Sequence, residues 1–141
     1  MEFREDREVI DSFTSETLER LSGIEVSLLR IGQDAQPFDD VLNAVFRDAH
    51  SIKAGANLLK FKNVETLAHH LEDILDALRI TKTLPSEEVL NAVIAALDKM
   101  RDLLDDLPGS DLVDVSAEVE KLLAPGIKNR LGIPARTGQT E

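Results

Sequence analysis

Apolar side chains recur every three or four residues along most of the chain, a spacing that keeps them on one side of a helix. The first stripe predicts a helix over 7–31, and its members are Ile10, Phe13, Thr17, Leu21, Ile24, Leu28 and Ile31. A glycine and a proline in 32–37 interrupt the pattern. A second stripe then predicts a helix over 37–59, with Leu42, Val45, Phe46, Ala49, Ile52, Ala56 and Leu59 as its members.

The pattern continues through two more stripes and a shorter one. A helix over 63–80 is predicted to start at Asn63, whose side chain can cap free amides, and its stripe is Val64, Leu67, Ala68, Leu71, Ile74, Leu75 and Leu78. A fourth helix is predicted to begin near Glu87 and to stop at Pro108-Gly109, and its stripe is Leu90, Val93, Ile94, Leu97, Met100, Leu104 and Leu107. A short fifth helix, capped by 114–116, should end at Pro125-Gly126.

These elements predict an all-α protein. Four amphipathic helices with short connections are typical of an up-and-down antiparallel four-helix bundle, to which a short fifth C-terminal helix is added. The absence of Tyr and Trp also argues against strands. We therefore expect one helical bundle over 1–124 and, because glycine and proline are frequent after it, a flexible linker or tail over 125–141.

Composition narrows the functional classes. The 141 residues fit a single domain, and the formal charge of −11 gives a surface that repels nucleic acid and anionic lipid. No cysteine is present, which excludes disulfides and thiolate chemistry. Because there is no long apolar run and the N-terminus is charged, we expect no membrane insertion and a cytoplasmic location.

Polar residues on the second and third helices form the one candidate constellation. On an ideal helix His50 falls at the edge of the buried face, with Lys53 between it and the core, and Glu72 lies on a flank of the next helix. If the two helices form a hairpin centred near Phe61, His50 and Glu72 are both 11 residues from that centre. Lys53 and His69 are both eight residues from it, so the four side chains are predicted to converge.

Such a cluster suits phosphoryl chemistry. A carboxylate bonded to one imidazole nitrogen fixes the tautomer and leaves the other nitrogen as a lone pair that can attack phosphorus. A free imidazole has a pKa of about 6.5 and is largely neutral at physiological pH, so this type of side chain needs no strong base to act as a nucleophile. Glu72 would orient the ring of His50, and the Lys53 ammonium could face phosphoryl oxygens.

The sequence around these residues resembles a known family. The segments FRDAHSIKAGA at 46–56 and HHLEDILD at 69–76 are similar to the paired motifs of histidine phosphotransfer (HPt) domains, in particular the type at the N-terminus of the chemotaxis kinase CheA. The resemblance implies that His50 is the phospho-acceptor and Glu72 its hydrogen-bonding partner, with Lys53 and His69 completing the network. It departs from the family at Ala54, where glycine is common, and at 59–61, where the usual glycine between the helices is missing.

The resemblance also implies the partners. A separate ATP-binding kinase domain would phosphorylate His50 on the nitrogen remote from Cβ, and an aspartate of a response-regulator receiver would then take the phosphoryl group. Both are expected to dock around His50, and the predicted docking residues are Arg47, Ala54, Gly55 and Asn57. No glycine-rich phosphate loop occurs, so we expect no bound nucleotide or other cofactor and no autonomous catalytic activity.

Two other interpretations remain open from the sequence. His50, His69 and Glu72 are residue types that bind zinc or ferrous iron, and helical bundles host such sites, although the Glu-x-x-His pairs of di-iron bundles are missing. A purely structural docking bundle, in which His50 has no chemical role, is the other alternative.

Overall fold

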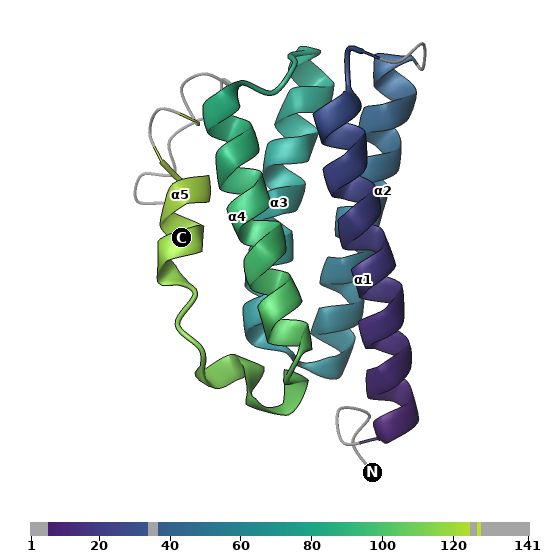
Figure 1. Cartoon of the computed structure of the whole chain (residues 1–141), viewed down its shortest axis with the longest axis vertical. Coiled ribbons are helices and arrows are strands. Elements are labelled where there is room, and N and C mark those ends of the chain that lie inside the picture. The colour runs from purple at the N-terminus through teal and green to yellow at the C-terminus, as the bar shows by residue number, and fades with distance from the viewer. Residues whose placement is uncertain (1–5, 34–36, 125–126, 128–141) are drawn as a thin grey trace.

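The computed structural model describes residues 6–33, 37–124 and 127, and every regular element among them is helical (Figure 1). Four long helices are followed by a 3₁₀ helix and a short α-helix. Their bounds are α1 Arg7–Arg30, α2 Phe38–Leu59, α3 Lys62–Thr81, α4 Glu87–Leu104, η2 Leu107–Leu112 and α5 Ser116–Leu122. The predicted all-α class is confirmed.

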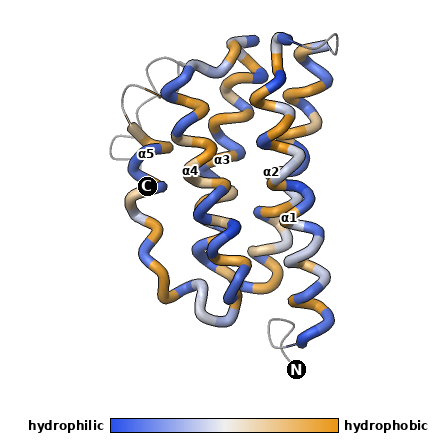
Figure 2. The backbone as a smooth tube through the Cα atoms, viewed as in Figure 1, coloured by the Kyte–Doolittle hydropathy of each residue, from blue (hydrophilic) through white to orange (hydrophobic). Residues whose placement is uncertain are grey.

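The four long helices run alternately up and down, with α1 between α2 and α4 and α3 closing the bundle on the other side (Figure 1). Helix α5 packs outside this bundle against α3 and α4. Hydrophobic positions follow each helix as stripes (Figure 2). Apart from the half-buried Ile94, the members listed for the four long stripes are buried or packed against the core. This packing agrees with the predicted four-helix bundle, and α5 adds the fifth helix.

Several helix boundaries differ from the prediction by a single residue, and two differences bear on the packing of the bundle. Helix α4 ends at Leu104 rather than at Pro108-Gly109, and these two residues lie inside the separate helix η2. Asn63 does not cap α3, because that helix starts one residue earlier, after the fully buried Phe61. The Asn63 side chain instead donates hydrogen bonds of 2.7 Å to the carbonyls of Ser110 and Val113, so it fastens η2 to the start of α3.

The turn between α2 and α3 is short and fixed at both of its residues. Lys60 adopts the left-handed conformation, with φ at 66°, that glycine commonly takes at the end of a helix. The Phe61 amide donates a 2.9 Å hydrogen bond to the Ala56 carbonyl, and the Phe61 side chain is fully buried. A lysine therefore fills the place of the missing glycine, and the hairpin centre is where the sequence predicted it.

Little of the predicted tail lies in the described part of the chain. Ile127 is buried against the hydrophobic core, so packing continues beyond 124. The other residues of 125–141 lie outside the described residues.

Gly55 on α2 packs closely against Phe13 on α1. A Cβ atom at Gly55 would lie 2.9 Å from the Phe13 ring, and that ring stacks on Phe61 at 6.1 Å between centroids. Because Phe61 is fully buried, the Phe13 ring has little freedom to move away. Gly55 thus has a packing role that is independent of any partner.

We predict opposite stability effects for alanine at two helical glycines. Gly23→Ala should stabilise the fold by up to about 1 kcal/mol, since alanine favours helix and its Cβ would meet only Asp48 at 3.8 Å. Gly55→Ala should destabilise it by about 1–3 kcal/mol through overpacking against Phe13. Urea unfolding measures both, and a stabilised Gly55→Ala would contradict the packing role.

Candidate functional site

Along the seam between α2 and α3, hydrogen bonds that join the two helices recur every seven residues. Three cross-helix hydrogen bonds join residues that lie 4, 11 and 18 positions on either side of Phe61. These pairs are Asn57–Glu65 at 2.8 Å, His50–Glu72 at 2.5 Å and Asn43–Arg79 at 3.2 Å. Seven residues are two helical turns, so each pair repeats the geometry of the one before it.

His50 is at once exposed and fixed. Its side chain is 58% exposed, while its Nδ1 lies 2.5 Å from Oε2 of Glu72. Because a carboxylate only accepts hydrogen bonds, Nδ1 carries the proton and donates it to Glu72. Nε2 is then the nitrogen with the free lone pair, and it has no hydrogen-bond partner among the described residues.

Glu72 is a buried carboxylate with two cationic or donating partners. Its side chain is 9% exposed, and Oε1 accepts a 2.5 Å hydrogen bond from Nζ of Lys53. Burial by itself raises the pKa of Glu72, but the hydrogen bonds and charges of Lys53 and His50 outweigh it, so the pKa lies below its ordinary value. Glu72 is therefore an anion at neutral pH.

The structure brings together three of the four residues predicted for the cluster. His50, Lys53 and Glu72 are in direct contact. The described partners of His69 lie on its own helix, with Nε2 3.6 Å from Oδ2 of Asp73 and its ring edge-on to that of His70. Taken by itself in the sequence, Glu72 is typical of a solvated charge on a helix surface. Its burial follows from the register between α2 and α3, which places it against His50 and Lys53.

The predicted docking residues lie along α2. Arg47, Ala54 and Asn57 are exposed, and Asn57 also donates to Glu65 across the seam. Gly55 is half-buried next to Phe13.

Sequence reasoning missed Arg79. Its guanidinium lies 4.3 Å from the centroid of the Phe46 ring, and Phe46 in turn stacks on His50. The signal was present, because Arg79 follows Glu72 by seven residues and therefore faces α2 as Glu72 does.

The metal interpretation gains no support. Within the described residues, no group of three or more His, Cys, Asp or Glu side chains is arranged to hold a metal ion. His50 and Glu72 bind each other and Lys53, while His69 is paired with Asp73.

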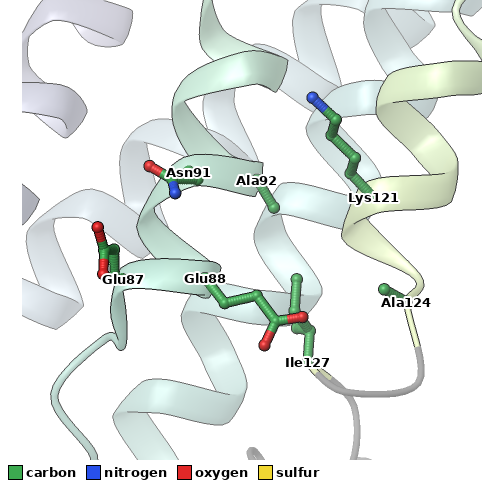
Figure 3. A pocket seen from close by; sticks show the side chains of 7 residues that line it. All are labelled: Glu87, Glu88, Asn91, Ala92, Lys121, Ala124 and Ile127. Atoms are coloured by element: carbon green, nitrogen blue, oxygen red, sulfur yellow. The ribbon is translucent and has the colours of Figure 1, made fainter.

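A pocket of about 380 Å³ lies away from this seam, between the start of α4 and α5 (Figure 3). Ala92 and Ile127 line it together with charged side chains, among them Glu88 and Lys121. None of the predicted site residues reaches it, so it is separate from the histidine site.

Comparison with known proteins agrees with this geometry. The sequence profile of the family described as "Hpt domain" matches residues 8–110. The chain belongs to the Hpt domain family. Its relatives include chemotaxis protein CheA of Klebsiella aerogenes, 35% identical over 106 residues, which are 75% of this chain and 16% of the relative. CheA of Rhizobium meliloti is 33% identical over 96 residues, 68% of this chain and 12% of that protein.

A solved structure shows the same fold. The phosphorylated P1 domain of CheA3 from R. sphaeroides, in complex with CheY6, matches this Hpt domain with a TM-score of 0.67 at 21% identity. The match covers 89% of this chain and 96% of the other. The chain spans less than a fifth of the length of the two curated CheA relatives. None of the described helices is long and apolar enough to cross a membrane.

We predict that Glu72→Gln destabilises the Hpt domain in a pH-dependent way. Because the pKa of Glu72 is lowered in the folded state, its carboxylate contributes stability fully above the ordinary glutamate pKa of about 4.3 and loses it as the pH falls through the lower folded value. At pH 7 the variant should be about 1–3 kcal/mol less stable than the wild type.

Urea unfolding between pH 7 and pH 3 measures this difference, which should shrink in the acid range. Glu65→Gln, on the exposed pair of the same seam, is the control and should cost less than about 0.5 kcal/mol. If the difference in the free energy of unfolding between Glu72→Gln and the wild type stayed constant from pH 7 to pH 3, the lowered pKa of Glu72 in the folded state would be contradicted.

Proposed function

We propose that this Hpt domain is a phosphoryl carrier in two-component signalling. A separate ATP-binding kinase domain phosphorylates His50, and an aspartate of a response-regulator receiver removes the phosphoryl group. The observation that carries the proposal is the exposed imidazole of His50, which the buried Glu72 carboxylate holds at Nδ1. Because the donor is ATP, we also place the domain in the cytoplasm.

The chemistry follows from the fixed tautomer. The Nε2 lone pair attacks the γ-phosphorus of ATP on the kinase, an N–P bond forms, and the bond to the bridging oxygen breaks so that ADP leaves with the electron pair. The ring becomes positively charged, and the Glu72 carboxylate stabilises it through the Nδ1 proton. In the return step an aspartate oxygen attacks phosphorus, and the electron pair of the N–P bond goes back to Nε2.

Lys53 and His69 have different places in this proposal. The Lys53 ammonium has three donor hydrogens, so it can keep Glu72 and also bind a phosphoryl oxygen. His69, whose described partners are Asp73 and His70, contributes at the rim of the site and does not hold the ring of His50.

The docking surface of the proposal is the exposed side of α2. Arg47, Ala54 and Asn57 lie three or four residues from His50 or from one another, so they share its face of the helix. The small side chain of Ala54, one turn after His50, leaves room for a partner to reach the phosphoryl group. Gly55 is explained by its close packing against Phe13, so a glycine is required at this position whether or not a partner docks there.

We predict that His50→Gln abolishes phosphorylation. A CheA-type kinase domain with radiolabelled ATP should place acid-labile, base-stable phosphate on the wild type, and a receiver domain should then remove it. The His50→Gln variant should acquire no label, because glutamine has no nucleophilic ring nitrogen.

His70→Gln is the matched control, since His70 is a histidine of the neighbouring helix, with its ring edge-on to that of His69, that no step of this proposal uses, and it should be labelled like the wild type. Label that persists on His50→Gln would overturn the assignment of His50. A wild type that no CheA-type kinase domain labels would overturn the carrier function itself.

A further inference from the structure

Beside His50 lies a stack of side chains that the proposed function does not use. The rings of Phe46 and His50 are close to parallel, with an interplanar angle of 21° and 6.4 Å between centroids. This separation is within the range of offset aromatic pairs. Phe46 lies one turn before His50 on α2, so the two rings project from the same face of the helix.

Arg79 fixes the far end of this stack. Its guanidinium carbon lies 4.3 Å from the centroid of the Phe46 ring, a cation–π contact. One terminal nitrogen pairs with Asp76 at 2.5 Å, and the other donates to Oδ1 of Asn43 across the seam at 3.2 Å. The planar guanidinium is therefore held by residues of both α2 and α3, and it restrains the Phe46 ring on which it stacks.

The imidazole needs such a restraint. Its Nδ1 hydrogen bond to Glu72 fixes one atom but leaves the ring free to pivot about that bond, which would move Nε2 away from an approaching phosphorus atom. A ring that is more than half exposed receives little restraint from packing against the core. Phe46 supplies a flat apolar surface against this pivoting, and Arg79 keeps Phe46 in place.

We propose that Arg79 and Phe46 are positioning residues for phosphoryl transfer, acting in series: Arg79 orients Phe46, and Phe46 holds the imidazole of His50 so that Nε2 faces outward. This inference rests on the proposed function, because it concerns the same nucleophile. Neither residue touches phosphorus.

The test separates positioning from docking and from folding. Arg79→Ala should lower kcat for phosphorylation of the Hpt domain by the kinase by roughly two- to fivefold, as expected for loss of a cation–π contact. The KM for the Hpt domain should stay at the wild-type value. If Arg79 were instead a contact for the kinase, KM would rise, and that result would overturn the inference.

A second variant tests the order of action. Phe46→Leu keeps an apolar side chain but removes the ring, and it should lower kcat at least as much as Arg79→Ala. Because Arg79 acts through Phe46, the double variant should be no slower than Phe46→Leu alone. Losses that multiply in the double variant would contradict the serial arrangement.

Arg101→Ala is the matched control for stability. Arg101 also pairs with an aspartate three residues before it, Asp98, and with a residue of a neighbouring helix, Glu25, but on the seam between α4 and α1. The Arg101→Ala variant should lower the urea midpoint of unfolding about as much as Arg79→Ala does, and it should leave kcat for phosphorylation unchanged. Equal losses of kcat in the two variants would mean that Arg79 acts only through stability, and would overturn the inference.

Imidazole nitrogen NMR shifts of His50 give a readout that does not depend on the kinase. The wild type should show the tautomer with the proton on Nδ1, and Arg79→Ala should show a detectable share of the other tautomer as the hydrogen bond to Glu72 loosens. Unchanged shifts and unchanged kcat in Arg79→Ala, with a wild type labelled on His50, would defeat this inference and leave the carrier function intact. A wild type without label would defeat the carrier function.

Discussion

The register between α2 and α3 is the constraint on which the site depends. It is set at the turn, where Lys60 takes the left-handed conformation and Phe61 is fully buried. From there, two antiparallel helices of equal rise bring residues at equal distances from Phe61 to one height. A shift by one residue would rotate Glu72 by about 100° and remove it from His50, so the chemistry depends on a turn 11 residues away.

The same seam explains how an ionic group can lie inside the bundle. A buried carboxylate is unfavourable unless partners compensate for its lost hydration. Lys53 and His50 provide that compensation, and both come from the facing helix. The exposed ring of His50 and the partly exposed side chain of Lys53 keep one side in water, so the charge cluster is buried at its centre and open at its edge.

The sequence predicted the four long helices, the hairpin centre and the convergence of His50, Lys53 and Glu72, because helix periodicity and equal rise are local rules. It missed the end of α4 and the role of Asn63, because both depend on the contact between η2 and α3, which are far apart in the chain. It also missed the packing role of Gly55, because that role depends on the Phe13 ring, which belongs to another helix. The network role of His69 was taken from the same register and remains a prediction.

The central claim is that Glu72 occupies Nδ1 of His50 and leaves Nε2 for phosphorus. Nitrogen and phosphorus NMR of the phosphorylated domain, labelled with ¹⁵N in histidine, tests it most directly, since the two ring positions give distinct shifts and couplings. The account predicts that the phosphoryl group is on Nε2 and that a proton remains on Nδ1. A phosphoryl group on Nδ1 would contradict it.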